Sequence, residues 1–368
     1  MVPLSPSFGP FGSDADVLVG FQQAGATVST NAKRLRQSLG AVLSFAVGIG
    51  LVLAVTAWSG VGSAEVWETL GRAHAGYIVL FGASYLLDCL IVTYRWECVA
   101  GQLVSTQGMR GHFLLYTLLT NLVSQLVPPH LSLVIVRPLA LRAHRQLAVS
   151  KGIVSTIFEM LFDLLVPALV LIPWVGILLF GGGIYIEFLL AFCVLGLGTV
   201  VVWRRGLVLA HLVGSARRRL LRMWPSRAAA DTESFFVGED VRGMLRKLWG
   251  LSVVRYVNMV LRTCLVLPAF ALDIPWDTVA MGVSPVILAS YLGPTPASLG
   301  VAEAVWVLVL ARSGVAASAA TTFALAGRAL HLFNVVVMAG VGIPWLWLQI
   351  RGRLRAQVAK PSVDTRHP

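Results

Sequence analysis

Two proline clusters interrupt apolar stretches of the sequence: Val127-Pro128-Pro129-His130 in the first half and Leu292-Gly293-Pro294-Thr295-Pro296 in the second. Proline lacks a backbone N–H and clashes with the preceding helical turn, so we expect a helix to end at each cluster. The apolar limbs beside the clusters, residues 112–127, 278–292 and 300–311, would be only about 18 to 24 Å long as helices. Because a bilayer core of about 30 Å needs roughly 20 helical residues, the sequence predicts two re-entrant helical hairpins.

The composition indicates an integral membrane protein. Of the 368 residues, 57% are hydrophobic and 12% are charged, whereas a soluble domain has about 25% charged residues. The net charge of +12 comes from basic blocks beside the apolar segments, which favours contact with anionic lipid over binding of nucleic acid. The four cysteines show no CxxC or metal-site spacing, so we expect no disulfide framework, no metal and no cofactor.

The hydropathy pattern predicts an all-α polytopic fold with six full spans in addition to the hairpins: residues 39–58, 77–94, 153–175, 184–203, 248–272 and 316–349. Residues 1–37 are expected to form a flexible cytoplasmic arm, residues 38–350 the transmembrane domain and residues 351–368 a cytoplasmic tail. Eight full spans are the alternative.

Basic residues favour the cytoplasmic side of a membrane. A re-entrant first hairpin keeps Arg137, Arg142, Arg145 and Lys151 inside, together with the basic loop 204–247. Both termini are then cytoplasmic in a multi-pass protein of the cell membrane. The halves, about 38–180 and 181–350, have opposite orientations. Two broken segments at corresponding places of an inverted repeat are typical of a transport site.

Ionisable side chains inside the membrane form the next set of candidates, because a charge at the centre of a spanning helix costs at least about 2.5 kcal/mol. Glu159 and Asp163 lie four residues apart and face the same way, and Arg255 and Arg262 share a stripe with Asn258. The remaining ones are Asp88, Glu303, Arg328 and His331. Two explanations stay open: structural ion pairs, or a polar cavity whose arginines hold an anionic head group through bidentate bonds.

At these residues the sequence resembles the flippase-like, lysylphosphatidylglycerol synthase transmembrane family, over most of the chain. The residues that carry the resemblance occur in the family's order: Arg95-Trp96, Asn121, Pro129, Arg137, Glu159, Asp163, the stretch Pro296-Ala297-Ser298-Leu299-Gly300-Val301-Ala302-Glu303, and Arg328. The chain departs from the family pattern where Leu133-Val134 replaces Gly-Glu, Met160 replaces an arginine, and Ala297 and Ser298 replace two glycines. No soluble aminoacyl-transferase domain is recognised, so synthase activity is not expected.

The resemblance implies a lipid transporter that moves an anionic phospholipid or a polyprenyl-linked lipid between leaflets, without being an enzyme. The expected substrate-binding residues are Arg137, Arg255, Arg262, Arg328, Asn121, Pro129, Pro296 and Gly300. Glu159, Asp163, Glu303 and His331 are expected to pair with the arginines or to carry coupling protons. Two alternatives are a membrane-embedded lipid-modifying transferase with Glu159 and Asp163 as its acids, and a non-transporting subunit of an envelope-assembly complex. The identity of the lipid, the energy source, and homodimerisation or other partners stay open.

Overall fold

A computed structural model describes residues 46–60, 68–69, 71–106, 108–145, 147–180, 186, 189–204 and 239–358. The chain divides into two compact units, Met1–Ala46 and Val47–Pro368, and the contacts below all lie within the second. Among the described residues every regular element is a helix. The predicted N-terminal arm and most of the predicted loop 204–247 lie outside the described residues, as does the end of the tail.

Among the described residues, four helical segments are long and apolar enough to cross a membrane: Ala75–Ala100, Val149–Gly176, Val241–Ala269 and Ala317–Gln349. They correspond to α3 (Ala75–Ala100), α6 (Val149–Phe180), α8 (Glu239–Cys264) with the turn that follows it, and α12 (Ala317–Val358). Two shorter apolar helices, Ala46–Ser59 and Leu189–Arg204, lie within the predicted spans 39–58 and 184–203 or one residue beyond. The described parts of the chain therefore confirm an all-helical membrane architecture, with long apolar helices at the places of four of the six predicted spans.

The first proline cluster separates two packed helices, α4 (Arg110–Val123) and α5 (Pro129–Arg145). Pro129 is the first residue of α5, where its missing N–H removes no helical bond. The 14 residues of α4 extend about 21 Å and the 17 residues of α5 about 26 Å. Both helices are therefore shorter than a bilayer core.

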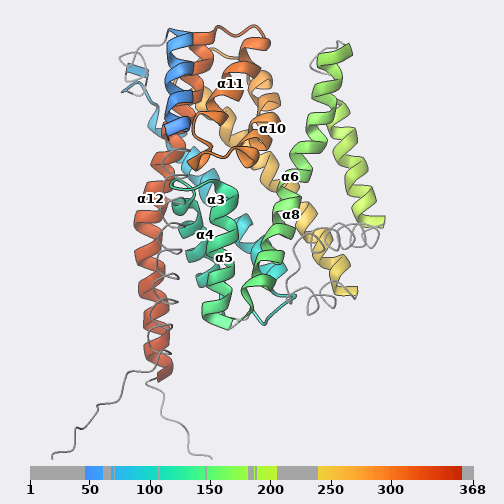
Figure 1. The fold of residues 1–368 in the computed structure, drawn as a ribbon, viewed down its shortest axis with the longest axis vertical. Coiled ribbons are helices and arrows are strands. Elements are labelled where there is room, and N and C mark those ends of the chain that lie inside the picture. Colours follow the sequence, from blue (N-terminus) through green and yellow to red (C-terminus); the bar gives the residue numbers. More distant parts are fainter. Residues whose placement is uncertain are drawn as a thin grey trace, which may run out of the picture. The chain divides into compact units, whose positions relative to one another are not determined.

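The second cluster separates α10 (Trp276–Leu292) from α11 (Val301–Arg312), which pack side by side (Figure 1). Between them lie an extended Gly293 and the 3₁₀ turn η2 (Pro296–Ser298). Ala297 and Ser298 have φ values of 50° and 57°, in the left-handed region that favours glycine. These are the two positions at which the sequence departs from the glycines of the family pattern that it resembles.

The tips of the two hairpins are joined directly. The Ala297 backbone N–H donates to the Ser124 carbonyl at 2.9 Å, although the two residues belong to different halves. The Arg328 guanidinium of α12 donates to the Ala297 carbonyl at 2.8 Å. These bonds satisfy backbone groups that the broken helices leave without helical partners, which is how non-helical backbone is tolerated inside a membrane protein.

The helices of the two halves pack in a reciprocal pattern. The first limb of each hairpin contacts the last long helix of the other half: α4 packs on α12, and α10 packs on α6. The second limb of each hairpin contacts the long helix that follows it, so α5 packs on α6 and α11 on α12. The central helices α3 and α8 pack on each other. A repeat with two equivalent halves would produce this set of neighbours.

Large apolar side chains cover the outer faces of the long helices. Val79 on α3 and Val341 on α12 are each 69% exposed, and Leu308 on α11 is 68% exposed. A soluble monomer rarely exposes contiguous apolar surface of this kind, whereas lipid solvates it. These faces, together with the four long apolar helices, identify a multi-pass membrane protein.

A substitution at Gly300 tests the backbone conformation and the close packing at the second helix break. Its φ is +79°, and a Cβ there would lie 2.4 Å from the Leu51 Cβ and 2.6 Å from the Gly48 carbonyl oxygen. Gly300→Ala is expected to lower the free energy of unfolding by about 2 to 4 kcal/mol, from left-handed strain plus overpacking. Gly314→Ala is the matched control, because Gly314 has a φ of +85° and open space around its Cβ position. Thermal unfolding in detergent should show the larger loss for Gly300→Ala; equal losses would contradict the packing.

Candidate functional site

Asp163 on α6 gathers groups from three other helices. One carboxylate oxygen accepts from Arg95 of α3 and from the Arg255 guanidinium of α8, the latter at 2.6 Å. The other accepts from the Tyr291 hydroxyl of α10 at 3.2 Å. Arg255 extends the network, because its Nε lies 2.9 Å from Asp88 of α3. The stripe predicted for α8 therefore faces the acidic groups of α3 and α6.

A second buried pair joins the first hairpin to the helix that follows it. Arg137 of α5 is 2% exposed and binds the Glu159 carboxylate of α6, which is 1% exposed. The Arg137 guanidinium also lies over the Trp96 ring, 5.0 Å from its centroid, an arrangement that adds a cation–π attraction. Both partners are therefore desolvated, and Arg137 is held by one carboxylate and one aromatic ring, while its Nε has no hydrogen-bond partner among the described residues.

Arg95 and Trp96 directly follow the predicted span 77–94, a place in the sequence that predicts a position at the membrane interface. The structure buries both, with exposures of 0% and 1%. Arg95 binds Asp163 and donates to the Glu159 backbone carbonyl at 3.0 Å. The sequence does contain a signal for this position: Arg95 lies seven residues after Asp88, and so on the same face of α3.

The second hairpin is also joined to the helix that follows it by an ion pair, but here the hairpin contributes the carboxylate and the helix contributes the arginine. Glu303 on α11 is 3% exposed and lies 2.9 Å from the Arg328 Nε of α12. Its other carboxylate oxygen accepts the Gly300 backbone N–H at 2.7 Å, across the first turn of α11. Arg328 thus holds both the start of α11 and, through the Ala297 carbonyl, the hairpin tip.

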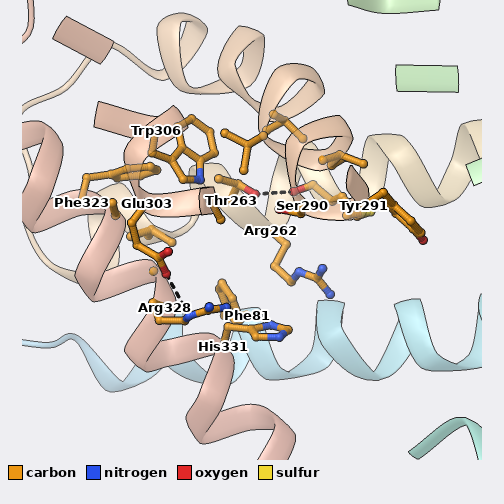
Figure 2. A pocket seen from close by; sticks show the side chains of 18 residues that line it. Phe81, Arg262, Thr263, Ser290, Tyr291, Glu303, Trp306, Phe323, Arg328 and His331 are labelled. Atoms are coloured by element: carbon orange, nitrogen blue, oxygen red, sulfur yellow. Dashed lines mark hydrogen bonds and ion pairs between the residues drawn. The ribbon is translucent and has the colours of Figure 1, made fainter. Parts of the chain in front are cut away.

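A cavity of about 240 Å³ lies between α8, α10, α11 and α12, with Phe81 of α3 on one wall. Its walls are largely apolar, and Val283, Ile287, Trp306 and Phe323 contribute to them. Four ionisable side chains predicted from the sequence line it: Arg262, Glu303, Arg328 and His331. Figure 2 shows Arg262, Arg328 and His331 around one end of this space, with Glu303 beside Arg328.

Arg262 is the least paired of the buried arginines in the described part of the chain. It is 8% exposed, and its Nη1 lies 3.7 Å from Asp88, too far for a hydrogen bond. That nitrogen has no hydrogen-bond partner among the described residues. Its guanidinium lies over the Phe81 and Tyr85 rings, with the group 5.8 and 5.4 Å from their centroids. The cavity therefore has one cation in its wall that is only weakly compensated.

The other predicted binding residues lie away from this cavity. Asn121 of α4 donates to the Tyr85 hydroxyl at 3.1 Å. Pro129 starts α5 and Pro296 starts η2, so both shape the backbone breaks. Gly300 packs against helix Ala46–Ser59 through Gly48 and Leu51. Arg137 and Arg255, together with Glu159 and Asp163, form the ion pairs described above.

The apolar and hydroxyl-bearing walls of the cavity contain residues that the sequence did not single out. Thr263 and Ser290 line it, and Tyr291 lines it while also binding Asp163. Thr263 directly follows Arg262 in the sequence, and Ser290 and Tyr291 precede the second proline cluster. Their closeness in sequence to predicted residues is the feature from which they could have been identified. In the described residues, no three His, Cys, Asp or Glu side chains group as metal ligands do.

Comparison with known proteins gives one family. The model of the lysylphosphatidylglycerol synthase TM region matches residues 41–339, a range that contains both hairpins, all the ion pairs described for α3 to α12 and the cavity. No curated protein and no solved structure matches the chain. Because the family match covers most of the sequence, this multi-pass membrane protein belongs to the family of the lysylphosphatidylglycerol synthase TM region.

Proposed function

We propose that this protein moves an amphiphile with an anionic head, a phospholipid or a polyprenyl-linked lipid, between the leaflets of the cell membrane. The family points to a lipid-related function, and the cavity beside the second hairpin is the observation that carries the proposal. At about 240 Å³ it is smaller than the roughly 300 to 1,000 Å³ of sites that enclose a drug-sized ligand. A head group fits there while the acyl chains stay in the bilayer.

The arrangement of the two broken segments supports transport over simple lipid binding. The short hairpin limbs, the bond between the tips and the reciprocal packing of the halves are what an inverted repeat with hairpins entering from opposite faces would produce. In such a protein the substrate site lies near the bilayer midplane, beside discontinuous helices. Access from the two sides would then alternate around the meeting point of Ser124 and Ala297.

The transferase alternative has less support. Its proposed acids, Glu159 and Asp163, are held by Arg137, Arg95 and Arg255 and do not line the cavity that contains Arg262 and Arg328. A general acid must reach the reacting atom directly or through one water. We therefore propose a binding and transport role with no chemical step.

Cysteine labelling tests the topology. In a variant without the four native cysteines, Arg145→Cys is expected to be protected from an impermeant thiol reagent in intact cells, because the first hairpin keeps the end of α5 inside. Ala316→Cys, between α11 and α12, is expected to be labelled from outside. Labelling of position 145 in sealed cells would instead indicate that α4 and α5 cross the membrane, as in the eight-span alternative.

Leaflet translocation in proteoliposomes tests the function. With fluorescent anionic lipids in both leaflets, an impermeant quencher should reach all of the label in vesicles that contain the protein and about half in empty ones. Arg328→Leu should reduce the rate at least tenfold, because the cavity loses a cation and the tip loses its support. Arg328→Lys should be intermediate, since a lysine lacks the planar fork.

The matched control is Arg312→Leu, which removes the same charge from the exposed end of α11 and should leave the rate unchanged. Arg328 also pairs with Glu303, so the double variant Arg328→Leu/Glu303→Gln separates the two roles. It should fold, because no carboxylate is left unpaired, and still fail to transport. Wild-type transport by the double variant would contradict the binding role and leave a purely structural ion pair.

A further inference from the structure

The charges of the buried groups do not balance. Apart from the surface pair Arg110–Glu97, the ion pairs of the described long helices and hairpins join five arginines (Arg95, Arg137, Arg255, Arg262 and Arg328) to four carboxylates (Asp88, Glu159, Asp163 and Glu303). Four of the arginines have a carboxylate oxygen within 2.9 Å of a guanidinium nitrogen. Arg262 does not, and it is the one whose weakly held guanidinium lines the cavity. One positive charge is therefore available to a ligand.

We propose that the cavity binds the phosphodiester of a lipid whose head group carries no other charge, with Arg262 and Arg328 as its cationic partners. This inference rests on the proposed function and narrows its substrate class. A single negative charge matches the single excess cation. A planar guanidinium suits phosphate oxygens, with which it can form two parallel bonds.

The remaining polar groups disfavour more highly charged heads. Glu303 is the acidic side chain in the cavity wall, and its two oxygens are taken by Arg328 and by the Gly300 N–H. An added ammonium group on the lipid would therefore face two arginines without a free carboxylate partner. A diphosphate would bring at least two negative charges against one uncompensated cation, leaving a buried negative charge unpaired.

Arg262 has a distinctive stability signature under this proposal. Removing a weakly paired buried cation should not destabilise the ligand-free protein, in contrast to removing an arginine from a tight buried pair. We expect Arg262→Leu to unfold at the wild-type temperature or above. A fall as large as that of Arg137→Leu would show that Arg262 serves as the structural partner of Asp88, and would overturn the proposal.

Binding of short-chain lipids to the purified full-length protein in detergent supplies the direct test. The probes are dioctanoyl phosphatidylglycerol, its lysyl ester, a polyprenyl diphosphate, and glycerol phosphate as a soluble anion, with native mass spectrometry as the readout. We expect phosphatidylglycerol to bind at least tenfold more tightly than the other three. Arg262→Leu should lose that preference, Arg262→Lys should retain part of it, and Arg312→Leu should keep it.

The outcomes separate this proposal from the proposed function. Equal binding of the lysyl ester or the diphosphate would overturn the charge argument, even if translocation occurs without head-group preference. If glycerol phosphate bound as tightly as the lipid, the claim that the bound phosphodiester belongs to a lipid would be overturned. Selective binding that depends on Arg262, in a protein that does not translocate any probe, would support this inference and contradict the transport function instead.

Discussion

Asp163→Leu is expected to lower the free energy of unfolding by roughly 3 to 5 kcal/mol, the typical loss when one partner of a buried ion pair is removed. The Asp163 carboxylate is the shared acceptor for Arg95, Arg255 and Tyr291. Its loss leaves Arg95, which is fully buried, without a carboxylate contact, and leaves Arg255 with Asp88 alone. Because the four groups come from α3, α6, α8 and α10, the packing of both halves around the cavity depends on this one side chain.

Thermal unfolding in detergent, followed by size-exclusion chromatography, measures the effect. Asp163→Asn keeps an acceptor oxygen but removes the charge, so it should cost less than Asp163→Leu. The double variant Asp163→Leu/Arg95→Leu should recover part of the loss, since Arg255 retains Asp88. If Asp163→Leu unfolds at the wild-type temperature, the carboxylate is not the centre of the network.

Arg137→Leu should have a comparable effect, roughly 3 to 5 kcal/mol, through a different pair. It would strand the Glu159 carboxylate, which is 1% exposed and has one oxygen already without a hydrogen-bond partner among the described residues. The double variant Arg137→Leu/Glu159→Leu should restore most of the stability, because two apolar side chains of similar volume can replace a buried ion pair.

The surface pair Arg110–Glu97 provides the control for that experiment. Arg110 is 80% exposed at 3.3 Å from Glu97, and exposed pairs contribute about 0 to 1 kcal/mol. Arg110→Leu should therefore shift the unfolding temperature only slightly. If Arg137→Leu is equally mild, or if the Glu159 double variant is less stable than the single one, the buried pair does not stabilise the first hairpin as described.

The departures from the family pattern acquire a physical meaning in the structure. Ala297 and Ser298 adopt left-handed backbone where the family has glycine, so the tip of the second hairpin holds strain that glycine would relieve. In the second hairpin, Glu303 pairs with an arginine of the following helix α12, whereas in the first hairpin Arg137 pairs with a carboxylate of the following helix α6. Val134 stands where the family has an acidic residue, and Arg137 is paired by Glu159 of α6 alone in the ion pairs described.

The sequence by itself determined the class of the protein, the places where the helices break and most of the intramembrane ionisable groups, with Arg95 as an exception. These follow from local properties: apolar length against bilayer thickness, the missing N–H of proline, and the cost of a charge in lipid. The α5 start at Pro129 and the turn at Pro296 lie at the predicted clusters. The limbs α4, α10 and α11 likewise have the short lengths expected of them.

Only the tertiary structure decided which charges pair and which cation in the cavity wall is left weakly paired. Helical spacing places Arg255 and Arg262 on one stripe of α8, but their partners depend on how α8 is rotated against α3 and α6. Asp88, for example, contacts Arg255 across 167 residues of sequence. About two helical turns then separate Arg255, which is tied to two carboxylates, from Arg262, which the same neighbours leave weakly paired. Local periodicity carries no information about such long-range contacts, because packing between distant helices sets them.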